Sequence, residues 1–166
     1  MLTWGLTLTG SADATTDAVL PVSYVNARLR SGSQSYLQVT IPYTVANAAD
    51  VTARQNGDLQ LTYKDSSGEH AVVDVALETI QISRGQQSAA IVLTGHRQST
   101  NSSPTSHTVV PLSFQTGSTA TTAIIPGYNP DIKPGDDVTA FGTTYTLNTV
   151  SVQAQPTSVT TQLIGS

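Results

Sequence analysis

Three aspartates gather around a Pro-Gly pair near the end of the sequence, at Asp131, Asp136 and Asp137. Carboxylate oxygens bind hard cations such as Ca²⁺, which takes roughly six to eight oxygen ligands in proteins. Three carboxylates and nearby backbone carbonyls could supply that number, although the spacing of an EF-hand loop is missing. Aspartates are also common in turns because they hydrogen-bond to the local backbone. The sequence therefore predicts no metal site, but it leaves open whether this turn binds a cation.

The three histidines, His70, His96 and His107, stand apart from one another in the sequence. No two of them are two residues apart, which is the spacing that puts side chains on one face of a strand. The chain also lacks cysteine, an H-E-x-x-H pair, a G-x-S-x-G turn and a glycine-rich phosphate loop. We expect no catalytic residue, no cofactor site and no enzyme activity.

The composition points to a neutral, hydroxyl-rich surface. Charged residues make up 11% of the 166 residues, whereas soluble domains have about 25%. Thr and Ser are abundant instead, so hydroxyl groups stand where charges normally would. Seven basic residues against eleven acidic ones give no footprint for nucleic-acid phosphates. No apolar run is long enough for a membrane-spanning helix, and the alternating segment Met1–Thr9 does not resemble a signal peptide. We therefore expect a protein made in a cytoplasm that neither binds nucleic acid nor inserts into a membrane.

Alternation of apolar and polar residues predicts a β-rich fold for the elements that must position these side chains. Alternating strands are expected around 37–41, 59–63, 73–82 and 89–93, as a four-stranded meander. The sequence Asp65-Ser66-Ser67-Gly68 predicts a hairpin turn, and the shift in register between Leu77 and Ile80 predicts a β-bulge. Further turns are expected at 84–86 and 129–137, with a last meander over 138–164.

Two segments depart from the strand pattern. The alanine-rich stretch 45–54 ends before Asn56-Gly57 and predicts one short helix. Residues 98–130 contain no formally charged side chain and alternate loop-like with strand-like fragments. They form either a long surface loop or an arm that is ordered by packing against a neighbouring copy. The predicted fold is a single mainly-β domain over 1–166, an antiparallel β-sandwich or barrel-like set of meanders, with 98–130 as a protruding uncharged loop or arm.

Several segments together resemble small structural proteins of the tail tip and baseplate of tailed bacteriophages, of the distal-tail or baseplate-hub kind. The closing segment is similar to a strand-turn-strand unit of baseplate hub proteins. The resemblance rests on turn residues and apolar alternation at 35–42, 53–59, 80–88, 93–95, 134–138, 142, 145–147 and 150. It implies a β-rich subunit of an oligomeric ring or collar in the virion tail, with other tail or baseplate proteins as partners and no catalysis.

The residues themselves also favour assembly. A surface with few charges invites association, and strand edges without Lys lack the usual protection against pairing with another chain. Two other functions remain open. One is a tail-tube, head–tail connector or capsid-decoration protein. The other is a carbohydrate- or receptor-binding β-sandwich, which would need aromatic residues gathered on one face: Trp4, Tyr24, Tyr36 and Tyr128.

Overall fold

The computed structural model describes residues 3–10, 16–85, 89–100 and 103–166. The chain divides into two compact units. Unit 1 comprises Met1–Val25 and Tyr36–Arg97, and unit 2 comprises Asn26–Ser35 and Gln98–Ser166. This division does not decide whether the chain is the single domain predicted over 1–166, which therefore stays a prediction. Within the described residues, no helix is long and apolar enough to cross a bilayer.

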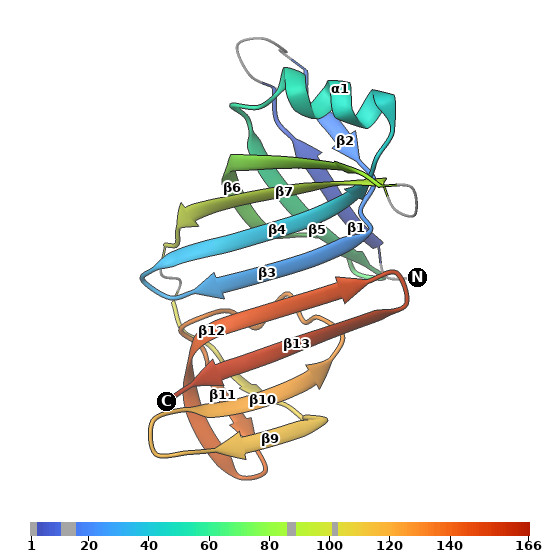
Figure 1. Ribbon diagram of the computed structural model, residues 1–166. Coiled ribbons are helices and arrows are strands. Elements are labelled where there is room, and N and C mark those ends of the chain that lie inside the picture. The colour runs from blue at the N-terminus through green and yellow to red at the C-terminus, as the bar shows by residue number, and fades with distance from the viewer. Residues whose placement is uncertain (1–2, 11–15, 86–88, 101–102) are drawn as a thin grey trace. The chain divides into compact units, whose positions relative to one another are not determined.

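Unit 1 is built on an antiparallel sheet with the strand order β2-β1-β5-β6-β7-β4 (Figure 1). Only β5, β6 and β7 form a meander, because the helix α1 separates β4 from β5 in the chain and β4 lies beside β7. The prediction of a four-stranded meander is therefore wrong for its first strand. The elements are β1 (Thr3–Leu8), β2 (Ala18–Leu20), β4 (Gln34–Pro42), α1 (Val45–Ala53), β5 (Asp58–Asp65), β6 (Gly68–Arg84) and β7 (Ala89–Gln98).

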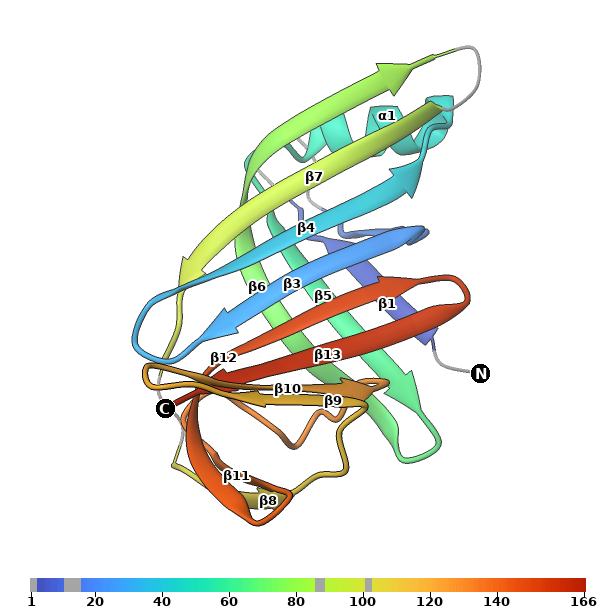
Figure 2. The same cartoon turned by 60° about the horizontal axis from the view of Figure 1, so that its bottom comes forward.

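Unit 2 has the strand order β3-β12-β13-β10-β9, and β11 pairs with the first part of β12 (Figure 2). The short strand β8 pairs with β11 in parallel, unlike the antiparallel pairs of the rest of this unit. The strands are β3 (Tyr24–Arg30), β8 (Ser106–Thr108), β9 (Ser113–Thr116), β10 (Thr121–Pro126), β11 (Asp137–Ala140), β12 (Thr143–Gln155) and β13 (Ser158–Gly165).

The alternation in the sequence places every second side chain of these strands in a core. In unit 1, β4 shows the pattern clearly, since Leu37, Val39 and Ile41 are buried and the residues between them are not. In unit 2, Ala123, Val150 and Val152 are buried in the same way. The prediction of a mainly-β, antiparallel fold with one short helix is confirmed.

The helix α1 occupies nearly the expected range, 45–53 instead of 45–54. It begins where the side chain of Thr44 accepts a hydrogen bond from the backbone N–H of Asn47 at 3.0 Å, which is an ordinary N-cap. Val51 is its one buried residue among those described. The turn at 65–68 and the bulge after Leu77 are also found as expected. The turn expected at 84–86 lies partly outside the described residues.

The segment 98–130 differs in part from the expected loop or arm. It contains β8, β9 and β10, and β10 lies between β13 and β9 in the sheet of unit 2. Ala123 on β10 is fully buried. Burial alternates along 121–126, so this stretch contributes one face to the core as any inner strand does. Among the described residues of this segment after Gln98, those outside the three strands have no regular secondary structure.

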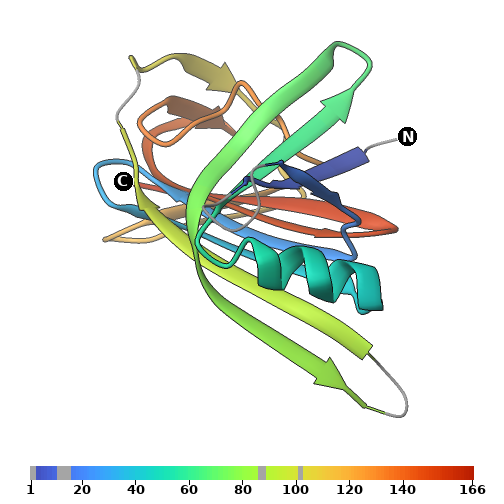
Figure 3. The same ribbon diagram turned by 90° about the horizontal axis from the view of Figure 1, so that it is seen from above.

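The two units share one local arrangement, which occurs once in each. A long strand has a β-bulge, between Leu77 and Thr79 in β6 and between Leu147 and Thr149 in β12. Each bulge lies opposite a glycine, Gly95 or Gly165, where a Cβ atom would collide with a backbone carbonyl of the long strand. The long strand changes its partner at this point: β6 runs first beside β5 and then beside β7, and it bends visibly between the two (Figure 3).

Candidate functional site

The acidic turn holds one buried carboxylate, that of Asp136. It accepts hydrogen bonds from the backbone N–H groups of Thr105 and Lys133, both at 2.8 Å. The Nε2 atom of His107 lies 3.2 Å from the same carboxylate. Burial by itself raises the pKa of Asp136, but the hydrogen bonds from Thr105, Lys133 and His107 outweigh it and leave the pKa below its usual range. The ionised carboxylate therefore ties the chain before β8 to the turn before β11.

The other two aspartates of this turn have different partners. Asp137 accepts a hydrogen bond from the hydroxyl of Thr146 at 2.6 Å. Asp131 is exposed, and its backbone N–H donates to the side chain of Asn129. Across the described ranges, no three His, Asp or Glu side chains are grouped so that they could hold a metal ion. The three predicted aspartates are thus close in sequence, but the structure does not assemble them into a ligand set.

Thr105, His107 and Asp136 combine the residue types of a nucleophile, a base and an orienting acid. In such a triad the acid binds one ring nitrogen of the histidine and the hydroxyl binds the other. Here both the Thr105 hydroxyl, at 2.8 Å, and the Asp136 carboxylate lie against the same atom, Nε2 of His107. This geometry does not relay a proton from the hydroxyl. A shallow pocket of about 410 Å³ opens beside the cluster and is lined by Ser103, Thr105, His107, Asp131, Lys133 and Asp136.

The remaining histidines also lie beside carboxylates, on the surface of unit 1. His70 is 3.2 Å from Asp65 across the hairpin turn, and His96 on β7 is 2.8 Å from Glu78 on β6. Asp65 also accepts hydrogen bonds from the side chain and backbone of Ser67, and these lower its pKa to about 2. Each of these pairs connects neighbouring strands or a turn, and none opens onto the pocket described above.

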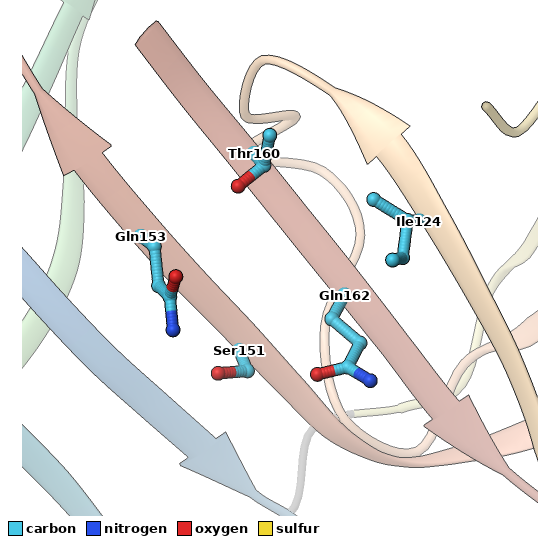
Figure 4. Close-up of a pocket in the computed structure, with 5 residues that line it drawn as sticks. All are labelled: Ile124, Ser151, Gln153, Thr160 and Gln162. Carbon is cyan, nitrogen blue, oxygen red and sulfur yellow. The ribbon is translucent and has the colours of Figure 1, made fainter. Parts of the chain in front are cut away.

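A second hollow lies on the outer face of the unit 2 sheet and is uncharged (Figure 4). Its side chains come from three adjacent strands, with the opposite face of the same strands forming the core. The residues that line it are Ile124, Ser151, Gln153, Thr160 and Gln162. Side-chain amides and hydroxyls offer hydrogen bonds to another surface, but without an ionisable group they offer no acid or base.

Several strand segments keep one side free of a strand partner within the described part of the chain. They include β2, which pairs with β1 alone, β9, which pairs with β10 alone, and the second half of β6, Thr79–Arg84, which pairs with β7 alone. The first half of β6 pairs with β5 alone, but it carries Glu69 and Asp74. The short β8 pairs with β11 alone, next to the charged turn. Because an unpaired strand side presents backbone N–H and C=O groups to an approaching extended chain, the uncharged open sides are the best candidate binding surface.

Exposed apolar side chains gather at the same places. Six large apolar residues are exposed among those described, and five of them adjoin an open side. Val19 belongs to β2 and Ile82 to β6, while Val110 and Leu112 precede β9. Phe141 packs edge to face on Phe114 of β9, with ring centroids 5.8 Å apart.

Phe141 also has an unusual backbone. It forms a two-residue turn with Gly142 between β11 and β12, and both residues have positive φ, 48° and 80°. For a bulky L-residue this conformation costs about 1–2 kcal/mol. The turn therefore presents an exposed aromatic ring at a place where Asn or Asp would be the common choice.

Comparison with known proteins rests on the fold. No protein-family profile matches the sequence, and no curated protein matches it significantly. The tail protein from Neisseria meningitidis MC58 superposes with a TM-score of 0.62 at 6% identity, over 99% of this chain and 96% of that one. The c3393 protein of E. coli, a type VI secretion component with structural similarity to the T4 bacteriophage tail proteins gp27 and gp5, superposes with a TM-score of 0.53 at 5% identity, over 96% of this chain and 75% of that one.

This chain has the fold of a tail protein. The resemblance to tail and baseplate proteins inferred from turns and alternation is confirmed at the level of the fold. The sequence did not reveal the open strand sides of this tail-protein fold, because they depend on which distant strands pair. The exposed residues Leu112 and Phe141 are ordinary apolar residues in the sequence, and only the absence of charge over 98–130 pointed to the region of Leu112.

Two aromatic residues of the sugar-binding alternative, Trp4 and Tyr36, pack on different rings. Trp4 packs on Tyr63 with ring centroids 5.1 Å apart, and Tyr36 packs on the ring of His96 at 5.0 Å. Trp4 lies on β1 and Tyr36 on β4, and three strands separate these in the strand order of unit 1. The tail-protein fold therefore uses these two rings in contacts within the sheet.

Proposed function

We propose that this chain is a non-enzymatic structural protein of a bacteriophage tail, assembled in the tail tip or baseplate as an oligomeric ring or collar. The observation that carries the proposal is the coincidence of open strand sides with exposed apolar residues. The likeness in fold to a tail protein and to a secretion component with tail-like architecture supports the same role. Its partners are copies of itself and other tail or baseplate proteins, and its place is the virion tail.

Open strand sides are a liability for a free monomer. Monomeric proteins usually protect them with Lys, Pro or inward-pointing charges, because unprotected ones pair with other chains. From Gln98 to Pro130 no charge is available for that purpose. In an assembly the same sides become contacts, since a neighbouring strand satisfies the backbone groups and covers the apolar residues. The strand β9 and the segment that contains it are the parts best suited to such a contact.

A second candidate role is a component of a secretion apparatus that is related in form to a phage tail. The similarity to the E. coli secretion component favours it, and the contacts would be of the same kind. The composition of the particle that contains the chain distinguishes the two roles.

The first experiment measures the mass of the purified chain by light scattering over a range of concentrations. We expect an oligomer, and we expect Leu112→Lys to weaken it at least about tenfold, because the change places a charge beside the open side of β9. The matched control is Val45→Lys. Val45 is 79% exposed and Leu112 is 70% exposed, but Val45 begins the helix α1, whereas Leu112 immediately precedes β9.

Mass spectrometry of purified phage particles provides the second readout. The proposal expects the chain in the tail fraction and expects less of the Leu112→Lys variant there than of the Val45→Lys variant. A wild-type chain that stays monomeric at all concentrations and is absent from particles would overturn the proposal. An enzymatic activity assigned to the isolated chain would overturn its non-enzymatic part.

A further inference from the structure

We propose that the open side of β9 in one copy pairs with the open second half of β6, Thr79–Arg84, in the next copy. This inference rests on the proposed function and names the contact that would build its ring. It follows from a comparison of two equivalent strands within the chain. One of them has a neighbouring strand on both sides, and the other has a neighbouring strand on one side.

The equivalent strands are β6 in unit 1 and β12 in unit 2. Leu77 pairs with Gly95 just before the bulge of β6, and Leu147 pairs with Gly165 just before the bulge of β12. Beyond the bulge, β6 continues beside β7 and β12 continues beside β13. Counted from the two leucines, Ile80 and Ile82 are the equivalents of Val150 and Val152.

The two strands differ in what lies on their other side. β12 has β3 as a second neighbour, and the backbone N–H of Ser31, just after β3, donates to the carbonyl of Asn148 at 3.1 Å. Val150 and Val152 on this strand are fully buried. The second half of β6 has β7 as its one strand partner among the described residues and lies at the margin of unit 1 (Figure 2). Its Ile82 is 39% exposed, where the equivalent Val152 is 0% exposed.

The strand β3, which lies beside β12, indicates which side chains a strand beside the second half of β6 would need. Ala27 and Leu29 on β3 are two residues apart and buried, so β3 contributes small or medium apolar side chains to the face that contains Val150 and Val152. A second copy of this chain holds a matching strand in the region of β9. Leu112 and Phe114 are two residues apart, Phe114 lies opposite the buried Ala123, and Leu112 is exposed.

Charge allows this pairing. The residues from Thr79 to Ser83 are uncharged, and so is the whole segment around β9. A contact between two β2 strands, in contrast, would bring together two copies of Asp17 and two units that each carry a net charge of −4. The strand β3 runs opposite to β12 (Figure 1), and we therefore expect β9 to run antiparallel to β6 of the next copy.

The contact joins two different surfaces, so it is head-to-tail. Such contacts generate a closed ring when the rotation between copies closes, whereas a contact between two β9 strands would stop at a dimer and leave β6 uncovered. The head-to-tail arrangement covers Leu112 and Ile82 at the same time. It thus explains two exposed apolar sites with one interface.

The test is disulfide cross-linking between two variants, which is clean because the chain contains no cysteine. Ser83→Cys places a thiol on the outer face of β6, and Gln115→Cys places one on the outer face of β9, opposite Thr122. Adjacent antiparallel strands hold paired Cα atoms about 4.5–5.5 Å apart, within the range that a disulfide spans. A second mixture, of Ser83→Cys with Ser113→Cys, tests a register that differs by two residues.

The matched control is Gln153→Cys mixed with Gln115→Cys. Gln153 is the equivalent of Ser83 on β12, and it is exposed, but its strand already has a partner on both sides. We expect a covalent dimer from the Ser83→Cys and Gln115→Cys mixture, with at least about a tenfold lower yield from the control mixture and from either variant alone. A wild-type mass that corresponds to an oligomer is the companion readout.

Each of the other possible results would refute a specific part of the proposal. Cross-linking of Gln115→Cys with itself would mean that β9 pairs with β9, and equal yields from the control would mean that contacts are nonspecific. An oligomer without a cross-link from either β9 position would refute the β9–β6 contact while leaving the proposed function in place. A chain that is monomeric at all concentrations would refute the β9–β6 contact, and its absence from particles as well would refute the proposed function.

Discussion

Replacing Asp136 with alanine tests whether the acidic turn is a structural clamp. The carboxylate accepts two backbone N–H groups at 2.8 Å and is almost completely buried. Each hydrogen bond to a charged group contributes about 1.5–3 kcal/mol to stability. A buried N–H group that is left without an acceptor costs about 1–3 kcal/mol. We expect Asp136→Ala to lower the free energy of unfolding by about 3 kcal/mol. Asp136→Asn keeps one acceptor oxygen, and we expect it to cost about half as much.

The assay is urea unfolding at pH 7, followed by far-ultraviolet circular dichroism. Hydrogen exchange at the amides of Thr105 and Lys133 gives a local readout, because these two groups lose their acceptor. The control is Asp131→Ala, which removes an exposed carboxylate from the same turn and should change the free energy by less than about 0.5 kcal/mol. A loss for Asp136→Ala no larger than that of the control would refute the clamp.

The pH dependence provides an independent check. The pKa of Asp136 is lower in the folded chain than the value of about 3.9 expected when it is unfolded. Its contribution is therefore fully present above about pH 4 and is lost as the pH falls through the folded pKa. The difference between wild type and Asp136→Ala should shrink steadily as the solution is acidified below about pH 4. A difference that stays constant down to about pH 2 would contradict this account.

Two further predictions concern unit 1. Ser67→Ala should raise the pKa of Asp65 from about 2 toward its usual value, because the hydroxyl bond at 2.6 Å is lost. A carboxyl titration by NMR measures the shift, and an unchanged titration would contradict the prediction. The stabilisation from the ionised Asp65 is present above its unfolded pKa and is lost as the pH falls through about 2. Thr44→Ala should cost about 1 kcal/mol in urea unfolding, because it removes the N-cap of α1. Thr52→Ala is the control, and an equal loss there would argue against a specific capping effect.

The features that sequence alone predicted are local ones. The helix at 45–53, the turn after Asp65 and the bulge after Leu77 each depend on residues within a few positions of one another. Capping residues, turn residues and a change in the phase of alternation report such features directly. The stretch 123–125, which lies within β10, belongs to the strand-like fragments noted within 98–130, although the uncharged surroundings suggested a loop.

The features that sequence missed depend on pairing between distant segments. β4 lies beside β7 and not beside β5, and nothing in the alternation of either strand specifies its neighbour. The hydrogen bonds of Asp136 to Thr105 and of His96 to Glu78 are set by strand register in the same way. The equivalence of the two units did leave a signal, since Leu-x-Thr and a later Gly recur with the same spacing at 77–95 and 147–165. The separation of these two ranges exceeds the period of the usual structural repeats.

The distribution of charge links the composition to the proposed assembly. Unit 1 contains four basic and eight acidic residues, whereas unit 2 contains three of each, so the net charge of −4 belongs to unit 1. Charges on a strand edge are what normally keep it from pairing, and β9 has none. The open half of β6 is likewise uncharged from Thr79 to Ser83, although it belongs to the charged unit. Charge is thus absent from the two strand sides that would have to meet, while the acidic residues of unit 1 remain available to keep the chain in solution before it assembles.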